Sequence, residues 1–184
     1  MTVKECMELA AVHLGIEEPI ATYFGESATA EDEKKATLLL SCFNIVENEL
    51  ALDYFPLIAE DTVETDGGVV EFSALKNDAV RITQVTDEWG NSAAFQLFPS
   101  YLKTQPGKVC VRYTYTPKKK ETSGTSDFYT AVSVRLISYG MAAEYAMATG
   151  LFEDAAVWDK KYKEGIRAAY RLQKCKRIRS RRWV

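Results

Sequence analysis

Few residues of this 184-residue chain have the types and spacing that catalysis requires. His13 is the only histidine, so no Ser-His-Asp or Cys-His set can be drawn with a choice of partners. Its place near the end of an apolar-striped segment is typical of a surface or capping histidine at a helix C-terminus. Neither a G-x-x-x-x-G-K-S/T motif nor a G-x-G-x-x-G motif after a predicted strand is present. We therefore expect a protein that is not an enzyme and that binds no cofactor.

The sequence also lacks a pattern that predicts a metal site. The cysteines are far apart, without C-x-x-C spacing, so they are expected as free thiols. They are Cys6, Cys42, Cys110 and Cys175. One acidic run consists of Glu60, Asp61, Glu64 and Asp66. Because it lacks the D-x-D-x-D-G spacing and the distal glutamate of a calcium loop, we interpret it as a charged strand edge that discourages aggregation.

The strongest chemical signal is the charge of the last twelve residues. They carry six basic side chains and no acidic one: Lys174, Lys176, Arg177, Arg179, Arg181 and Arg182. The whole chain has 23 basic and 26 acidic residues, which leaves 17 basic and 26 acidic, a net charge of −9, for residues 1–172. An acidic body with a basic tail indicates that the tail has a partner.

Three interpretations of this tail remain open. Basic residues interleaved with Ile178, Trp183 and Val184 suit an arm that docks on a protein and becomes ordered there, with the tryptophan as anchor. Nucleic acid is the second candidate partner, although one aromatic residue is few for stacking on single strands. The third interpretation is a solvated end without a specific partner.

Composition excludes two further classes of protein. Glu5 and Glu8 interrupt the apolar N-terminal stretch, so it does not have the pattern of a signal peptide. No segment approaches the roughly 18 uncharged apolar residues of a membrane span. A chain of 20.7 kDa is large enough to bury about 70% of its surface, so a core without disulfides is expected.

Hydrophobic spacing predicts four helices, over 2–15, 30–54, 127–149 and 151–172. Thr2 and Glu5 have the spacing of a capping box at the first helix, and Pro56 ends the second. The third is apolar on almost every side. Gly140 and several alanines leave one face with little side-chain bulk, so another helix can approach that face closely. The fourth has an apolar seam that suits a hairpin with the third.

Between residues 61 and 117 the hydrophobic period changes from 3.6 to 2, which is typical of strands. The turn Asp66-Gly67-Gly68 predicts a hairpin between 62–65 and 69–73. Further strands are expected at 80–85, 93–98 and 109–115, with a turn at Trp89-Gly90-Asn91.

These elements predict an α+β fold, with a bundle of about four helices and an antiparallel β insertion between the second and third helix. The expected division is 1–60 for the N-terminal helices, 61–118 for the insertion, 119–172 for the helical hairpin and 173–184 for a basic arm.

Four segments carry a resemblance to a known family. They are the strand end Val111-Arg112-Tyr113-Thr114-Tyr115-Thr116-Pro117, the Ala- and Tyr-rich helix Val132 to Met147, the turn Thr149-Gly150, and the helix end Ala168-Ala169-Tyr170-Arg171 before the basic tail. Their order, over nearly the whole chain, resembles the head–tail connector (adaptor) proteins of tailed bacteriophages, including the tail-tubular-protein-A-like adaptors.

The resemblance implies a structural virion protein that is assembled in the cytoplasm of the bacterial host and forms a ring, commonly a dodecamer, at the head–tail junction. The ring docks on the portal protein and carries the stopper or tail protein. DNA passes through its lumen without sequence-specific binding, and no membrane is involved. Helical faces make the subunit contacts, and a C-terminal arm embraces the portal. Portal binding then falls on Lys174, Lys176, Arg177, Arg179, Arg181, Arg182, Trp183 and Val184.

The alternative function is a DNA-binding regulator or packaging accessory protein that uses the basic tail. An enzyme of unrecognised type is a third hypothesis, which the scarcity of histidine and catalytic motifs disfavours.

Overall fold

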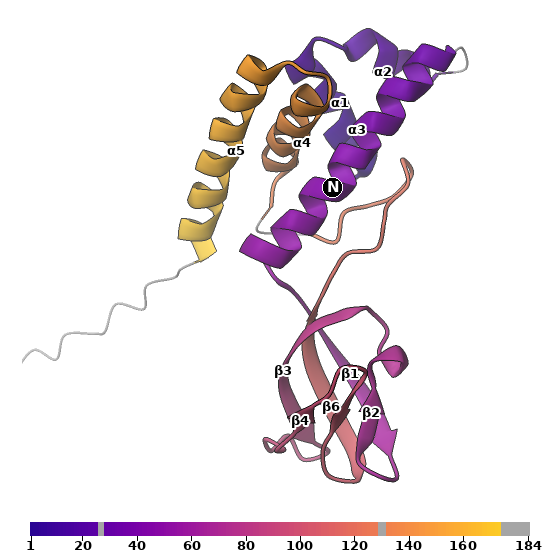
Figure 1. The fold of residues 1–184 in the computed structure, drawn as a ribbon, viewed down its shortest axis with the longest axis vertical. Helices are drawn as coiled ribbons and strands as arrows, with labels where there is room; N and C mark the ends of the chain where they lie inside the picture. Colours follow the sequence, from indigo (N-terminus) through magenta and orange to yellow (C-terminus); the bar gives the residue numbers. More distant parts are fainter. Residues whose placement is uncertain (26–27, 129–131, 174–184) are drawn as a thin grey trace, which may run out of the picture. The chain divides into compact units, whose positions relative to one another are not determined.

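A computed structural model describes residues 1–25, 28–128 and 132–173, in two compact units. The helical unit comprises residues 1–47 and the described residues from 119 onward, and the β unit comprises residues 48–118 (Figure 1). The described residues contain five α-helices and two small antiparallel sheets, which confirms the predicted α+β class.

The N-terminal residues form α1 (Val3–Leu14) and the short helix α2 (Glu17–Tyr23). The predicted capping box is present: the Thr2 N–H donates to Glu5 Oε2 at 2.8 Å, and the Glu5 N–H donates to Thr2 Oγ1 at 3.2 Å. Helix α2 replaces part of a predicted loop. Pro19 is tolerated there because it is the third residue of α2, where an N–H would have no helical acceptor.

Helix α3 (Ala30–Glu49) continues as a π-helical turn (Leu50–Tyr54), so helical structure covers the segment predicted at 30–54. A second capping box begins α3, in which Thr29 and Asp32 exchange hydrogen bonds between side chain and backbone. The Phe55 N–H donates to the Leu50 carbonyl, one residue before Pro56.

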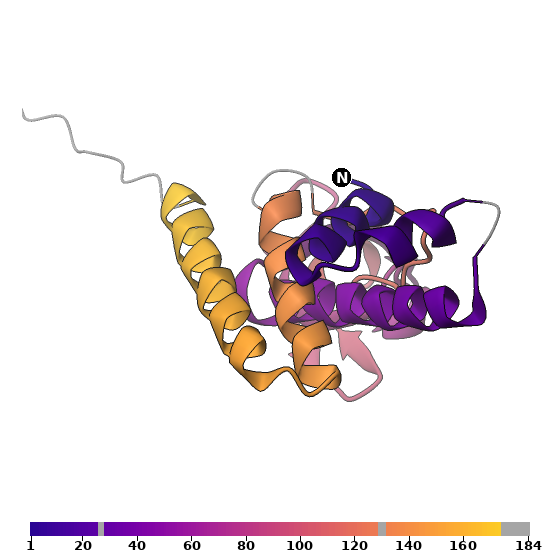
Figure 2. The same ribbon diagram turned by 90° about the horizontal axis from the view of Figure 1, so that it is seen from above.

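Helices α4 (Val134–Ala148) and α5 (Phe152–Gln173) form the predicted hairpin and lie side by side (Figure 2). The predicted start of α4 at residue 127 was wrong. Ser133 is the N-cap, and its Oγ accepts from the Leu136 N–H at 3.2 Å. The preceding residues 126–128 instead make non-helical hydrogen bonds.

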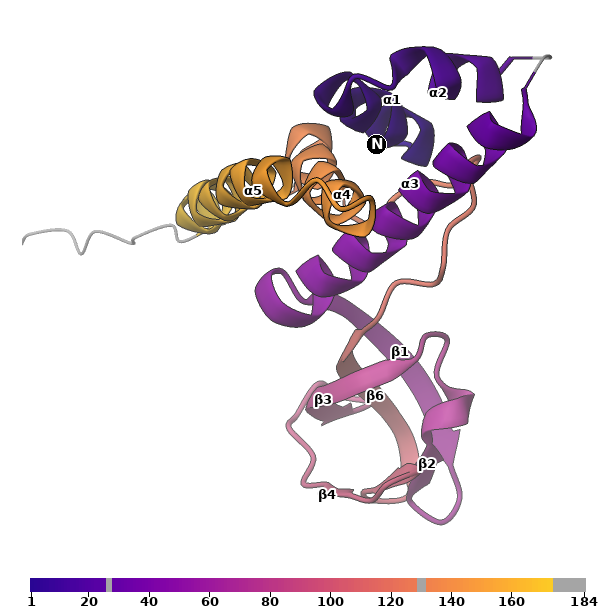
Figure 3. The same cartoon turned by 45° about the horizontal axis from the view of Figure 1, so that its top comes forward.

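Helix α4 lies between α3 and α5 (Figure 3), and α1 also packs on it. Gly140 makes this close packing fit. A Cβ at this position would lie 2.8 Å from Val46 Cγ1 of α3 and 2.9 Å from Tyr162 Cε2 of α5. The expected face of α4 with little side-chain bulk is therefore confirmed at Gly140, where helices from both ends of the chain approach.

Two side chains of α3 hold the chain where it returns from the β unit. Asn44 Oδ1 accepts from the Lys120 N–H at 2.6 Å, and Asn44 Nδ2 donates to the Lys120 carbonyl at 3.2 Å. Glu47 Oε1 accepts from Ser126 Oγ at 2.6 Å and from the Asp127 N–H at 2.9 Å. We call these five residues the α3 clasp.

The Glu47 carboxyl of the clasp is only 1% exposed. Burial raises its pKa, and the hydrogen bonds from Ser126 and Asp127 offset only part of this rise. The backbone of the same returning segment also meets the N-terminus, since the Val3 N–H donates to the Gly124 carbonyl at 3.0 Å.

The β unit contains two three-stranded sheets. The first has the order β1 (Leu57–Thr65), β6 (Gly107–Tyr115), β3 (Ala79–Asp87), and β1 pairs with β6 along its whole length, from Leu57 opposite Tyr115 to Thr65 opposite Gly107. The second has the order β2 (Val69–Glu71), β5 (Tyr101–Lys103), β4 (Gln96–Leu97). The predicted alternation on β6 is confirmed, with Val109, Val111 and Tyr113 in the core.

The predicted hairpin at Asp66-Gly67-Gly68 was wrong, because β1 pairs with β6 and β2 pairs with β5. Gly68 serves a different contact: its carbonyl accepts from the Thr104 N–H at 2.7 Å, and a Cβ at Gly68 would collide with the Thr104 carbonyl. The glycine therefore brings the chain against residue 104 and directs it into the second sheet.

The acidic run lies on the edge strand β1 and at its end, as interpreted, with Glu60, Glu64 and Asp66 exposed, but Asp61 is an exception. It is 5% exposed and accepts from Tyr113 Oη at 2.6 Å and from the Lys76 N–H at 2.8 Å. Burial tends to raise the pKa of Asp61, but the hydrogen bonds from Tyr113 and Lys76 outweigh it and hold the pKa below its ordinary value. This carboxylate joins the β6 core to the loop before β3.

We predict that Gly140→Ala destabilises the helical unit. Overpacking against Val46 and Tyr162 costs about 1–3 kcal/mol, of which the better helix propensity of alanine recovers about 1 kcal/mol. Gly165→Ala is the matched control, because its new methyl group meets only the flexible end of Leu136. Urea unfolding should rank the Gly140 variant as the less stable; the reverse order would contradict the packing described.

A second prediction concerns Glu47. Glu47→Ala should destabilise the protein by roughly 1–3 kcal/mol for each buried donor that loses its acceptor. Glu47→Gln keeps an oxygen acceptor and removes a charge that burial disfavours, so its free energy of unfolding at pH 7 should equal or exceed that of the unchanged protein. Equal losses in both variants, measured by urea unfolding, would show that the charge itself is required.

Candidate functional site

All eight residues predicted to bind the portal lie outside the described residues. They are Lys174, Lys176, Arg177, Arg179, Arg181, Arg182, Trp183 and Val184. The structure describes the helix that leads to them, α5, which ends at Gln173. The site can therefore be examined from its helical base.

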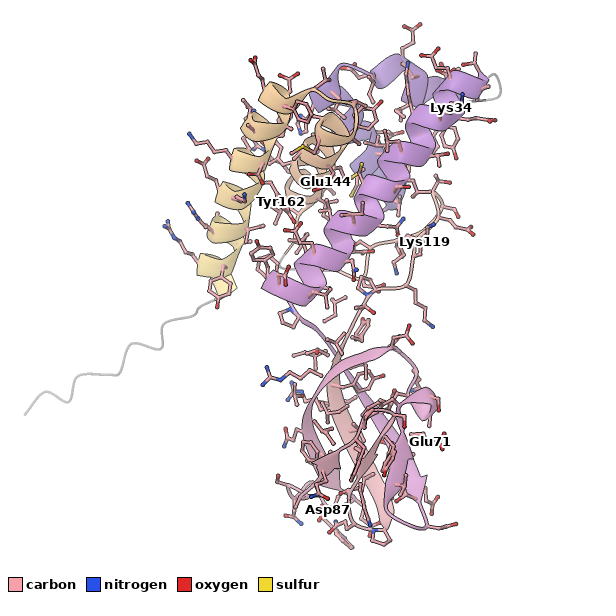
Figure 4. The ribbon with its side chains drawn as sticks, in the orientation of Figure 1. Lys34, Glu71, Asp87, Lys119, Glu144 and Tyr162 are labelled. Carbon is pink, nitrogen blue, oxygen red and sulfur yellow. The ribbon has the colours of Figure 1, made fainter. Side chains whose placement is uncertain are left out.

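The positive charge begins within α5 rather than after it. Its exposed basic residues are Lys160, Lys161, Lys163, Arg167 and Arg171, and Glu164 is the only acidic residue between 160 and 173. The first turn of α5 is acidic, with Glu153 and Asp154, so both ends complement the helix dipole. The opposite side of α5 buries Tyr162, which lies toward α4 (Figure 4).

Three half-buried aromatic rings meet where α1, α4 and α5 join. The His13 ring stacks on Trp158 with centroids 4.7 Å apart and an interplanar angle of 29°. Tyr139 lies 5.1 Å from His13 and 5.8 Å from Trp158, again between ring centroids. His13 lies in the last turn of α1, as predicted, but its half-buried ring also packs on Trp158 and Tyr139, which the sequence did not indicate.

Two cations complete this group, which we call the aromatic–cation junction. Lys161 Nζ lies 4.0 Å from the centroid of the Trp158 ring, within cation–π range. Arg135 Nε donates to Tyr139 Oη at 2.6 Å. Burial lowers the pKa of His13, and the charges of Lys161 and Arg135 lower it further. His13 is therefore neutral at pH 7.

The junction does not have the geometry of a catalytic site. Ser138 Oγ lies 3.2 Å from His13 Nε2, but this serine is fully buried and donates its proton to the Arg135 carbonyl at 2.9 Å. A nucleophile must reach a substrate, which Ser138 cannot do. What the junction offers is a rigid support for the exposed basic residues of α5.

Two of the thiols that the structure describes are unreactive. Burial raises the pKa of Cys6 and of Cys42 to about 12, so both remain protonated. Cys110 is also a free thiol, and Cys175 lies outside the described residues. Within 1–25, 28–128 and 132–173, no three potential metal ligands come together. None of the helices in those ranges has the length and apolarity to cross a membrane.

Sequence reasoning missed the junction, although part of its signal was visible. Arg135 and Tyr139 are four residues apart, and Trp158 and Lys161 are three apart, which places each pair on one helix face. The meeting of these faces with His13 depends on how α1 packs on α4, and periodicity carries no such information.

Comparison with known proteins assigns no family to this chain. No protein-family model matches it, and no curated protein matches its sequence.

The junction predicts a pH dependence. Because the pKa of His13 is lower in the folded than in the unfolded protein, the unfolded chain binds a proton first as the pH falls below about 6.5. The stabilisation from neutral His13 is thus full above that pH and is lost below it.

His13→Gln should remove this part of the pH dependence. Melting temperatures at pH 7.5 and 5.5 measure it, and the difference between the two should be smaller in the variant. The raised pKa of Glu47 makes the opposite contribution to the pH dependence of stability, but this contribution is the same in the variant and in the unchanged protein. An unchanged difference would mean that His13 titrates as it does in the unfolded chain.

Proposed function

We propose that this protein is a ring-forming head–tail connector of a tailed bacteriophage. In this role a homo-oligomeric ring, of dodecameric order in the proteins it resembles, docks on the portal protein and presents a surface to the stopper or tail protein. DNA passes through the lumen without sequence-specific contacts, and the ring performs no catalysis.

One observation carries the proposal: the exposed basic face of α5 continues in the sequence into the basic arm. From Lys160 to Arg182 the chain holds eleven basic residues and one acidic residue. The first five lie on a helix that Tyr162 and the junction fix to α4. A docking arm that extends from a fixed helix loses less conformational entropy on binding than a wholly free one.

The exposed apolar residues of the helical unit support oligomerisation. Around the α4–α5 turn, Met147, Leu151, Phe152 and Val157 are exposed, Phe152 at 66%. Neighbouring exposed apolar side chains are typical of interaction surfaces. In a ring, adjacent subunits would cover them.

The test is electron microscopy of the purified protein, with and without its candidate portal. We expect rings from the full chain, and loss of portal binding from a chain that ends after Gln173. Trp183→Ala is the matched full-length variant, since it removes the proposed anchor and keeps all six charges of the arm. Failure to form rings in either condition would overturn the proposal.

The DNA-binding alternative predicts a different dependence on salt. A protein that holds duplex DNA through six or more phosphate contacts should lose roughly a thousandfold or more in affinity between 50 and 200 mM salt. A portal-docking arm should show no useful duplex affinity at physiological salt. A monomer that binds duplex DNA with that steep dependence, and ignores the portal, would favour a DNA-binding regulator or packaging accessory.

A further inference from the structure

The β unit exposes a tryptophan on a firmly held loop. Trp89 is 77% exposed, more than any other large hydrophobic residue that the structure describes. Asp87 holds its loop: Oδ1 accepts from the Trp89 N–H at 3.0 Å and from the Asn91 N–H at 2.8 Å. Asp87 Oδ2 accepts from Asn91 Nδ2 at 3.1 Å. A large aromatic side chain on such a loop binds a pocket at low entropic cost.

The charges around Trp89 restrict what it can bind. Asp87 and Glu88 precede it directly, and Glu88 is exposed. Hydrogen bonds from Asn91, Trp89 and Gly90 lower the pKa of Asp87 against the effect of burial, so Asp87 is ionised at pH 7. Two carboxylates beside the ring repel nucleic-acid phosphates and favour an apolar pocket with a basic rim.

The same β unit contains a groove of this kind. It lies between the edge strands β3 and β4 and has a volume of about 170 Å³. Apolar side chains line it, together with one cation: Phe72, Val80, Ile82, Leu97, Phe98 and Arg81. A cavity of roughly 150 Å³ accepts one benzene ring, so this groove has room for the six-membered ring of an indole side chain. Val80 and Leu97, at its mouth, are 53% and 54% exposed.

Trp89 does not line the groove of its own chain. The groove contains the first residues of β3, and the loop follows the last one. The five residue-to-residue steps from Ile82 to Asp87 span about 16 Å of extended strand. Asp87 precedes the loop and Glu71 precedes the groove residue Phe72, and Figure 4 shows the two acidic residues well apart within the β unit. Trp89, which we call the knob, and the groove therefore lie at separate places on one β unit. This arrangement suits a contact between two copies of the chain.

We propose that Trp89 of one copy inserts into the groove between β3 and β4 of a second copy, with Arg81 facing the carboxylates of Asp87 and Glu88. The contact is heterologous, because each copy uses its loop on one neighbour and its groove on the other. Repetition of such a contact generates a ring when the rotation closes. The contact between two copies is independent of the proposed function. Only the closure of many copies into a ring rests on it.

Two substitutions test the two sides of the contact separately, one in Trp89 and one in the groove. Trp89→Ala removes the knob and leaves the groove intact. Leu97→Glu places a carboxylate at the groove mouth, where it meets Asp87 and Glu88, and leaves the knob intact. Both residues are exposed, and thermal unfolding checks that each variant is folded. Val69→Glu, at an exposed β2 residue outside the groove, is the control for adding a charge.

Sedimentation of the variants, alone and mixed, tests the contact. Self-association should weaken by at least about thirtyfold in Trp89→Ala and in Leu97→Glu. It should be unchanged in Val69→Glu and largely kept in Trp89→Phe. An equal mixture of Trp89→Ala and Leu97→Glu should form a dimer that goes no further, since together they hold one intact knob and one intact groove.

Charge reversal tests the proposed attraction between Arg81 at the groove and the carboxylates beside Trp89. Arg81→Glu and Glu88→Arg should each weaken association, and the mixed or doubly substituted proteins should recover it.

The outcomes separate this inference from the proposed function. Rings that form unchanged from Trp89→Ala would overturn the Trp89 contact and leave the connector proposal standing. Loss of portal or tail-protein binding in Trp89→Ala, with rings intact, would also overturn it and assign the loop to that partner. A knob–groove dimer without rings, even on the portal, would support the contact and overturn the connector proposal.

Discussion

The helical unit depends on the hydrogen bonds that the buried Glu47 side chain accepts from the returning chain. The chain leaves α3 after Glu49 and later contacts the same helix through Ser126, which lies 79 residues beyond Glu47. A buried carboxyl group disfavours its own charge, and the hydrogen bonds from Ser126 and Asp127 make this one tolerable. Every packing contact of α4 and α5 with the N-terminal helices requires that return. The clasp thus holds the returning chain against α3.

Once the chain has returned, packing at Gly140 determines how closely the helices approach. Val46 and Tyr162 touch this residue from α3 and α5, so segments from both ends of the sequence share one contact. The aromatic–cation junction repeats this arrangement at the surface, where His13, Tyr139 and Trp158 come from three helices. The position of α5, and hence of its basic face, follows from these contacts.

Much of the fold was predictable, because its signals are local. Periodicity and capping residues found α1, α3 and α5, and alternation found β6. The start of α4 was missed because residues 127–133 are apolar enough to continue the helix, and the clasp that holds Asp127 involves a glutamate 80 residues away. A hairpin at Asp66 was wrongly predicted, because Gly68 contacts Thr104 and β2 pairs with β5, which no local pattern reveals. Trp89 was recognised only as part of a turn, since its exposure depends on where the sheets lie. The predicted arm residues lie outside the described part of the chain.

Pairing of β1 with β6 has a consequence for how such a protein changes over time. Leu57 lies opposite Tyr115, so the β unit begins and ends at adjacent points. An inserted module with neighbouring ends can be lengthened, exchanged or deleted while the host fold keeps its connectivity. The helical unit can therefore keep its own fold while the inserted β unit changes in sequence or length.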